Sequence, residues 1–295
     1  MDRRTLLQTG VPAAVAASIG VSSAAETGIR GGAGAKPIRI LFLDHAPRKQ
    51  TGDRLYDPTP IERLLNSYAS PGTKIEIGYP DNFDGSKIGL LLGEQDKLNG
   101  LDHLMAAPTL IRKIFWAQEN GYDAVIQSNT FDPGVEGGRL AVTIPVIGPF
   151  RTAMHTALML CDRIGVTTPL ASDVPWTRRI LRAYGLESFV ADIKPVGVYS
   201  KDIQKRKKEL FDTAAKVMRS LVDDSGAQII VPLGGALIPY VVDPNDLAKA
   251  VGVPVLNTKA IAIRFAEACV AFGMTQSPAA YPHAALKMQD FQDRL

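Results

Sequence analysis

The sequence predicts an α/β fold of two pseudo-symmetric, Rossmann- or flavodoxin-like subdomains, each with a parallel sheet and with the functional site between them. Residues 122–148 begin with a short apolar run, continue through small polar residues and a segment of helical length, and end in a second apolar run. A short apolar run before a polar loop and a helix is typical of a buried parallel strand. Residues 227–257 repeat these features in the same order. The repeat predicts two halves related by an approximate two-fold axis.

The repeat extends upstream of both segments. Residues 39–44 resemble residues 163–168, and residues 61–72 resemble residues 176–185. The alternative is that α/β units resemble one another in general, but the ordered recurrence of several features favours a duplication. We therefore expect one subdomain to span residues 37–149 plus 257–295 and the other to span residues 150–256.

The individual elements follow from the apolar runs and their spacing. In the first half we expect strands at 38–43, 74–79, 124–126 and 144–147, with helices at 61–68 and 104–120. In the second half we expect strands at 163–168, 229–231 and 253–256, with helices at 151–160, 176–185 and 203–222. The last helix, 261–272, is expected to pack back on the first half, and the tail from 278 to 295 to form a short helix or a contact arm.

Residues 1–25 have the pattern of an export signal. A pair of arginines, Arg3 and Arg4, precedes an apolar stretch that ends in small residues at 23–25. This pattern predicts a secretory signal, and the paired arginines favour the twin-arginine route over an ordinary signal that happens to contain them. The apolar stretch is too short for a stable membrane span. Residues 26–36 are a Gly/Ala linker. Because residues 1–25 have the pattern of an export signal, the sequence predicts a periplasmic or otherwise exported protein.

Composition places the remaining chain among soluble globular proteins. Hydrophobic residues make up 46% of the sequence and charged residues 21%. The formal net charge of +3 gives no electrostatic reason to expect nucleic acid as a partner. The densest basic run, 205–208, lies in a predicted amphipathic helix and is expected to form a solvated face.

The sequence contains two cysteines, Cys161 and Cys269, both in segments with helical apolar spacing. A buried structural thiol is the expected role of each. A disulfide between them is possible in an oxidising compartment, but spacing in the sequence does not establish the necessary distance.

Three segments resemble the aspartate/glutamate/hydantoin racemase superfamily. They read YDAVIQSNTFDPGVEGGRLAVTIPVIG, RIGVTTPLASDVPWTRRILRAYGL and VGVPVLNTKAIAIRFAEACVAFGMTQS. The resemblance covers about residues 36–277 and is strongest to the hydantoin-racemase branch, which has Asp-Pro-Gly after its first loop and Val-Thr-Thr at the start of its second half. It implies a small carboxylate or hydantoin-like substrate held between two subdomains, with one cysteine from each loop beside the acidic carbon.

The cysteine positions of that superfamily are substituted in this sequence. The first cysteine corresponds to Asn129 when counted back from Asp132, or to Ser128 under a second alignment, and the second corresponds to Gly235. None of the three is a cysteine. The resemblance therefore implies the fold and the position of the site, whereas proton exchange between two thiols is not available to this chain.

Non-thiol candidates for catalysis lie at the carboxyl ends of predicted strands, where α/β proteins bind ligands. His45 could act as a general base near neutral pH, or could be an ordinary surface histidine. Asp44 could orient a substrate ammonium or amide, or cap the following loop. Ser128 and Asn129 follow the strand at 124–126. Lys259 could be a base or an anion ligand, although a solvent-exposed lysine at a helix start is the commoner case.

Substrate-binding candidates surround the same position. The hydroxyl groups and backbone amides suit a carboxylate or carbonyl oxygen, and the glycine-rich loop could form an oxyanion site or simply a tight turn. Arg151 could bind a carboxylate as a fork or form a structural ion pair. The full set of candidates is Thr130, Arg151, Thr167, Thr168, Gly234, Gly235 and Ala236.

Two functional hypotheses follow. The first is a cofactor-independent isomerase, racemase or lyase that acts at the carbon alpha to a carboxylate or carbonyl without cysteine catalysis. The second is an exported binding protein that kept the anion site and lost catalysis. No nucleotide-binding or metal-binding motif appears in the sequence, so we expect no cofactor and no metal. A homo-oligomer remains possible.

Overall fold

The computed structural model describes residues 36–45, 58–81, 91–93, 95–199, 203–283 and 285–291. The predicted export signal, residues 1–25, lies outside these ranges, as does the predicted linker except for Lys36.

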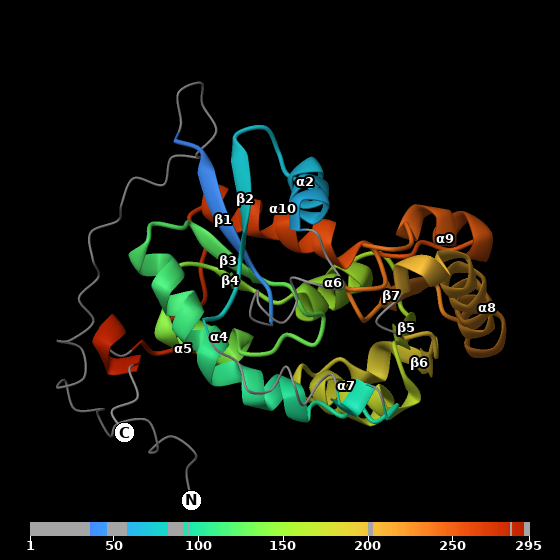
Figure 1. The fold of residues 1–295 in the computed structure, drawn as a ribbon. Coiled ribbons are helices and arrows are strands. Elements are labelled where there is room, and N and C mark those ends of the chain that lie inside the picture. The colour runs from blue at the N-terminus through green and yellow to red at the C-terminus, as the bar shows by residue number, and fades with distance from the viewer. Residues whose placement is uncertain are drawn as a thin grey trace, which may run out of the picture.

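The first sheet has four parallel strands in the order β2-β1-β3-β4. Its strands are β1 (Ile38–Leu43), β2 (Thr73–Gly78), β3 (Ala124–Gln127) and β4 (Val146–Ile147). Leu43, the last residue of β1, lies opposite Gly78 of β2 and Gln127 of β3. Because these strands end at one level, the residues that follow β1 and β3 emerge side by side at the same edge of the sheet (Figure 1).

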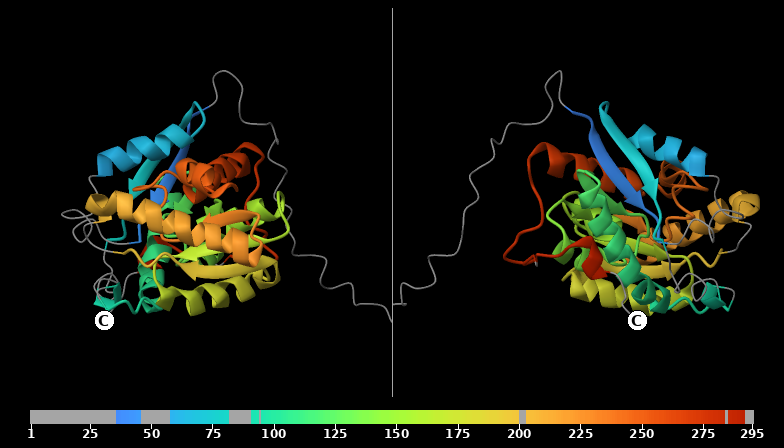
Figure 2. Two further views of the ribbon diagram at one scale, coloured as in Figure 1. Left: turned by 90° about the vertical axis from the view of Figure 1, so that its right-hand side faces the viewer. Right: turned by 60° about the vertical axis from the view of Figure 1, so that its left-hand side comes forward.

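Helices cover both faces of this sheet. Successive side chains of a strand point to opposite faces, so Ile40 and Phe42 pack on one side and Leu41 and Leu43 on the other. The first side is covered by α2 (Pro58–Tyr68) and α10 (Thr258–Ala271). The other side is covered by α4 (Leu101–Glu119) and α5 (Val135–Ala141), and Figure 2 shows α2 and α4 on opposite sides of the strands.

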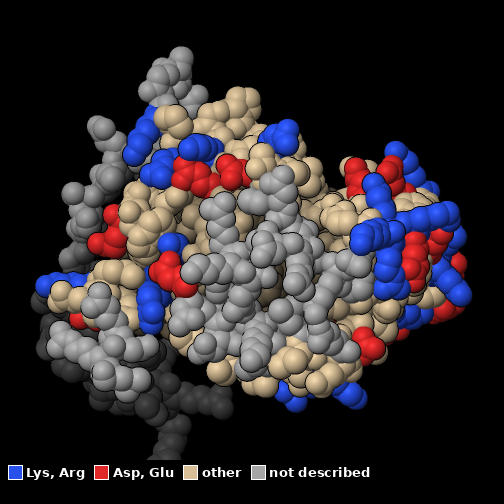
Figure 3. Space-filling model, in the orientation of Figure 1, with Lys and Arg blue, Asp and Glu red and all other residues tan. Residues whose placement is uncertain are grey.

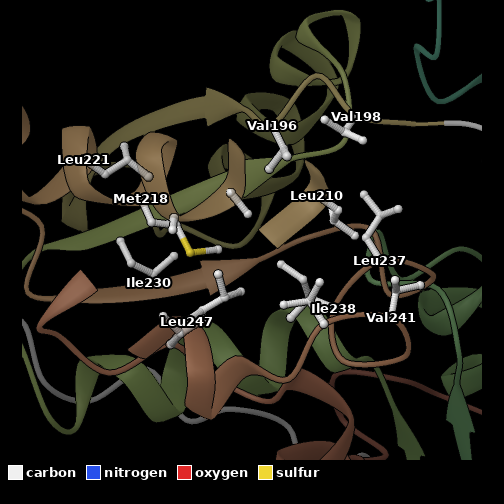
Figure 4. Packing of buried hydrophobic residues seen from close by; sticks show 14 of the residues in the cluster. Val196, Val198, Leu210, Met218, Leu221, Ile230, Leu237, Ile238, Val241 and Leu247 are labelled. Atoms are coloured by element: carbon white, nitrogen blue, oxygen red, sulfur yellow. The ribbon is translucent and has the colours of Figure 1, made fainter. Parts of the chain in front are cut away.

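The second sheet has the parallel order β6-β5-β7. Its strands are β5 (Ile164–Thr168), β6 (Val190–Pro195) and β7 (Ile229–Pro232). One face packs on α6 (Pro149–Leu158) and α7 (Val174–Ala183). The other face packs on α8 (Lys207–Ser225) and α9 (Pro244–Val251), where Ile230, Met218 and Leu247 form part of a continuous apolar cluster (Figure 4).

The two sheets share one topology, which confirms the predicted α/β fold with two similar halves. In each sheet the first strand is central, the second strand pairs on one side and the third on the other. The fourth strand differs: β4 pairs with β3, whereas the predicted strand 253–256 is reduced to a single bridge between Val255 and Ile230. The division of the chain after residues 149 and 256 stays a prediction.

The sequence did not reveal β6. Only Ile193 of its six residues is buried, so this edge strand lacks an apolar run such as 40–43 of β1.

Helices α6 and α10 join the two halves. Helix α6 begins two residues after β4 and packs on the second sheet, while α10 returns from the second half to pack on β1, β3, β4 and α6. The placement of α10 on the first sheet confirms the expectation that the last helix packs back on the first half.

A charged surface covers α8 and α9 of the second half. Lys205 and Arg206 stand in a 3-10 turn, η3 (Ile203–Arg206), directly before α8, and Arg206 pairs with Glu209 at 2.6 Å. Figure 3 shows lysine, arginine and acidic side chains intermixed over α8 and α9, as expected for a solvated face. Within the described ranges, none of the helices has the length and apolar character that crossing a bilayer requires.

Candidate functional site

The loops after β3 and β7 meet directly. The backbone N–H of Gly234 donates a hydrogen bond of 2.8 Å to Oγ1 of Thr130, which is completely buried. A Cβ atom added at Gly235 would lie 3.5 Å from the carbonyl oxygen of Ser128. The ends of the two sheets therefore adjoin at the loops that follow β3 and β7.

Lys259 fills the junction between these loops. It is the second residue of α10, which begins at Thr258 because the side chain of Asn257 accepts a hydrogen bond from the N–H of Ala260. Its Nζ donates to the carbonyl of Ser128, and a Cβ at Gly235 would lie 2.6 Å from its Cε. The side chain is 1% exposed, so the alternative of a solvated lysine is wrong.

Burial makes Lys259 a candidate base. Desolvation lowers the pKa of its ammonium to about 8, against the opposing charges of Asp44 and Asp132. The rings of Phe42 and Tyr240 lie 5.7 and 5.8 Å from Nζ. An amine with this pKa is partly neutral near physiological pH and can accept a proton.

Asp44 and His45 follow β1 beside the same loop. Oδ1 of Asp44 accepts a 2.6 Å hydrogen bond from the N–H of His45, lies 3.3 Å from its Nδ1, and is 3.5 Å from Oγ of Ser128. Burial lowers the pKa of His45, but the hydrogen bond and charge of Asp44 outweigh it and the pKa is raised overall. His45 therefore holds its proton to higher pH than an ordinary histidine, which suits a proton donor better than the base predicted from the sequence.

Both polar atoms of the Asn129 side chain, Oδ1 and Nδ2, have partners within the protein. Its Oδ1 accepts from the N–H of Phe131 at 2.9 Å, and its Nδ2 lies 3.3 Å from Nε2 of His103. The imidazole of His103 stacks on the ring of Phe131 with centroids 4.9 Å apart. Asn129 thus connects the loop after β3 to the first turn of α4.

Sequence reasoning missed His103 and its neighbour Asp102. Both are buried, and Nε2 of His103 lies 3.5 Å from Oδ2 of Asp102. Desolvation lowers the pKa of His103 to about 4. The predicted helix began at residue 104 and left both outside it; an earlier start at Leu101 would have placed two polar residues in the first turn, on a helix that packs against the sheet.

A further buried acid lies close to Asp102. Asp173 is 1% exposed, and one of its oxygens accepts from the N–H of Leu170 at 3.1 Å. Desolvation, assisted by the charge of Asp102, raises the pKa of Asp173 to about 7. Among the described residues, no group of three or more His, Cys, Asp or Glu side chains is arranged to hold a metal ion.

Two of the three candidate threonines, Thr130 and Thr168, have their hydroxyl groups hydrogen-bonded within the protein. Oγ1 of Thr130 accepts from Gly234, and Oγ1 of Thr168 donates to the carbonyl of Leu170 at 2.9 Å. Thr167 differs: within the described part of the chain its buried Oγ1 has no hydrogen-bond partner. Thr130 thus joins the two loops, and Thr168 holds its own loop in place.

The glycine loop also differs from the predicted oxyanion site. The N–H of Gly234 is bound to Thr130, and its φ of +85° requires glycine at this turn. Gly235 is buried against Lys259, and Ala236 is half-buried in the following turn. The clearest role of Gly235 is to leave room for the side chain of Lys259.

The guanidinium of Arg151 forms a structural ion pair. Its guanidinium lies 3.3 Å from Oε1 of Glu136 and 3.3 Å from the hydroxyl of Tyr281. These contacts correspond to the alternative interpretation of Arg151, and they replace the predicted carboxylate fork.

Asp132 organises the start of α6. Its carboxylate accepts hydrogen bonds from the N–H groups of Phe150 and Arg151, at 3.0 and 2.9 Å, and from the hydroxyl of Tyr184 at 3.0 Å. Burial raises the pKa of Asp132 although these donors oppose the shift. Asp132 therefore links the first-half loop to two helices of the second half.

Neither cysteine lies at the loops, and both are free. Cys161 follows the C-terminal end of α6 rather than lying in a helix, and its Sγ is 3.7 Å from the carbonyl oxygen of Arg163. Cys269 is buried in α10, ten residues or about 15 Å along the helix from Lys259.

Solved structures share the overall fold. Allantoin racemase from Klebsiella pneumoniae aligns with a TM-score of 0.70 and 21% identity, covering 85% of this chain and 95% of that one. Allantoin racemase from Pseudomonas fluorescens aligns with a TM-score of 0.71 and 21% identity, covering 85% and 98%. At these identities the likeness establishes the fold alone.

Sequence relatives identify the family. The hydantoin racemase of Rhizobium meliloti is 30% identical over 190 residues, which cover 62% of this chain and 76% of the relative. The hydantoin racemase of Pseudomonas sp. (strain NS671) is 28% identical over 178 residues, covering 60% and 70%. The family model of the Asp/Glu/Hydantoin racemases matches residues 99–266, more than half of the sequence. The chain therefore belongs to the Asp/Glu/hydantoin racemase family.

Proposed function

We propose that this protein is a cofactor-independent enzyme that moves a proton at the carbon alpha to a carbonyl or carboxylate of a small, hydantoin-like molecule. Lys259 supplies the base in place of the thiols. Family membership supports the isomerase class, and the names of the hydantoin racemase relatives support the substrate class. The substitution of both cysteine positions favours a lyase or an isomerase that uses a single base.

One observation carries this proposal: the amine of Lys259 lies between Ser128 and Gly235. By the resemblance, Gly235 corresponds to one family cysteine, and Ser128 or its neighbour Asn129 corresponds to the other. A buried amine with a pKa of about 8 has a substantial neutral fraction near that pH, and a neutral amine is a competent general base.

The surrounding charges suit a proton cycle. When Lys259 takes a proton, the ammonium that forms is stabilised by the charge of Asp44, which acts on Lys259. His45, which holds its proton because Asp44 accepts from it, can deliver a proton to a developing enolate oxygen or to the carbon. The two groups thus divide the roles of base and acid.

Exchange of the alpha proton tests the proposal. Small 5-substituted hydantoins and carboxylates are incubated with the protein in deuterium oxide, and NMR follows both exchange and product. We expect exchange at the acidic carbon, with a rate that rises towards pH 8 and then levels because Lys259 becomes neutral. Binding across the panel without exchange or product would instead establish the binding-protein alternative.

Export is a separate proposal that rests on residues 1–25 alone. The paired arginines, apolar stretch and small residues support transport through the twin-arginine route. Cell fractionation with N-terminal sequencing is expected to find a mature protein that begins near Glu26. An intact amino terminus in the cytoplasm would contradict it.

A further inference from the structure

The first turn of α4 brings two buried polar side chains to the loop after β3. Asp102 is 6% exposed and His103 is 7% exposed. His103 contacts Asn129, the residue directly after Ser128, whose carbonyl accepts from Lys259. The imidazole and the candidate base therefore approach consecutive residues of one loop.

The hydrogen bonds of Asn129 determine which nitrogen of His103 carries the proton. Because Oδ1 of Asn129 accepts from the N–H of Phe131, its amide nitrogen must be the atom that faces His103. An amide nitrogen only donates, so Nε2 of His103 accepts and Nδ1 bears the hydrogen. Desolvation, which lowers the pKa of His103 to about 4, keeps the ring neutral at physiological pH.

Two atoms of this pair lack partners. Among the described residues, neither Nδ1 of His103 nor Oδ1 of Asp102 makes a hydrogen bond, although both atoms are buried. Buried polar groups are normally satisfied, and an unpaired donor or acceptor costs free energy. One of these atoms is an N–H donor and the other is a carboxyl oxygen acceptor, on consecutive residues.

We propose that His103 and Asp102 form a two-point subsite for the N–H and C=O edge of an amide, imide or ureide substrate. Nδ1–H of His103 donates to the carbonyl oxygen, and Oδ1 of Asp102 accepts from the adjacent N–H. The inference rests on the proposed function, because it assigns the recognition of the molecule whose proton Lys259 moves.

The chemistry of a neutral imidazole suits this role. As the alpha proton leaves, negative charge develops on the carbonyl oxygen, and a donor aimed at that oxygen stabilises it. A neutral imidazole gives up its remaining proton very reluctantly, so His103 polarises the carbonyl without competing with Lys259 for the proton. The Asp102 oxygen meanwhile selects substrates that present an N–H beside the carbonyl.

Binding measurements test the subsite without relying on turnover. Probes are 5-methylhydantoin, succinimide and 2-pyrrolidinone, which have the N–H and C=O edge, and 1,3,5-trimethylhydantoin, which lacks the N–H. The variants are His103→Phe, which keeps a ring on Phe131, and Asp102→Ala. His155→Phe, an exposed histidine on α6, is the matched control.

We expect the unmodified protein to bind 5-methylhydantoin at least about tenfold more tightly than the trimethyl compound. This preference should disappear in Asp102→Ala, and affinity for all N–H probes should fall about tenfold or more in His103→Phe. His103→Asn, whose amide nitrogen can take the place of Nδ1, should restore part of the affinity. His155→Phe should bind like the unmodified protein.

Circular dichroism and thermal melts establish that each variant is folded. A folded pair of variants that binds every probe as the unmodified protein does overturns the subsite, as does a panel in which no probe binds the unmodified protein. The proposed function fails separately, when probes bind with the expected preference but no alpha proton exchanges.

Discussion

The loops after β3 and β7 occupy the same place in the two halves but differ in chemistry. Leu43 lies opposite Gln127 in the first sheet as Thr167 lies opposite Pro232 in the second, so Thr130 and Gly235 are equivalent positions. The first loop holds Ser128 and Asn129, in contact with Lys259 and His103. The second loop contributes glycines and a backbone N–H.

This difference shows that a symmetric fold can hold a one-sided site. The proposed base lies on α10, the proposed donors lie after β1 and on α4, and all three elements belong to the first sheet or pack on it. The family pattern implies one thiol from each half, one on each face of the substrate carbon. In this chain the second half has Gly235 beside Lys259, and this difference is the reason for proposing a single base.

The largest effect is expected for Lys259→Met, which removes the amine and keeps the length of the side chain. Exchange of the alpha proton should fall by about 10²- to 10⁴-fold, the usual contribution of a general base. Stability should rise, because burying the ammonium shifts its pKa from 10.5 to about 8, equivalent to about 3 kcal/mol against the charged state.

The pH dependence of stability tests independently whether folding lowers the pKa of Lys259. The unfolded chain binds more protons than the folded one between pH 8 and 10.5, so the stability of the unmodified protein should increase across that interval. Lys259→Met should lose this increase. Lys249→Met on α9, which is exposed and pairs with Asp246, is the matched control and should change neither rate nor pH slope. Full exchange activity in folded Lys259→Met would remove Lys259 from the mechanism.

The Asp-Pro dipeptides of the two halves give the next largest contrast. Asp132 is buried and accepts from two N–H groups and a tyrosine hydroxyl, whereas Asp243 is exposed and caps α9 through the N–H of Asn245 at 2.8 Å. Asp132→Ala should cost about 3 kcal/mol, since it leaves buried donors unpaired. Asp243→Ala should cost about 1 kcal/mol, the usual value for an N-cap.

Urea unfolding of both variants measures this contrast. The order of the two losses is the informative result, because each aspartate precedes a proline at a corresponding point of the repeat. Equal losses would mean that the buried network around Asp132 adds nothing beyond a simple helix cap.

The sequence predicted the fold more completely than the site because the two depend on different signals. The central strand β1 contains the apolar run 40–43, and the internal repeat identified β5 as its counterpart in the second half. Edge strand β6 lacks that signal. The candidates Ser128, Asn129, Gly235 and Lys259 were found because strand ends and family positions mark them, and the structure brings them together.

Side-chain direction explains the remaining differences. Arg151 follows β4 as predicted, but its guanidinium is paired with Glu136 and Tyr281, which are distant in sequence. His103 lies on α4, 26 residues before Asn129, and no sequence pattern indicates the contact between them. Burial of Lys259 likewise follows from two loops that come together only in the folded protein.

The smallest predicted effect tests the contact between the two loops. Gly235→Ala places a methyl group where Cε of Lys259 lies, at 2.6 Å, so the lysine must move away from Ser128. Exchange should fall about tenfold to a hundredfold, because a displacement of about 1 Å at a catalytic group is enough for such a loss. Thermal stability should change less, since the flexible end of a lysine gives way more readily than backbone does.

The control is a double-mutant cycle with Lys259→Ala, in which the added methyl meets no lysine. In that background Gly235→Ala should cost almost no stability and leave residual exchange unchanged. If Gly235→Ala lowers stability and exchange as much in the Lys259→Ala background as in the unmodified protein, the backbone itself requires glycine at 235. The second loop then does more than make room for Lys259.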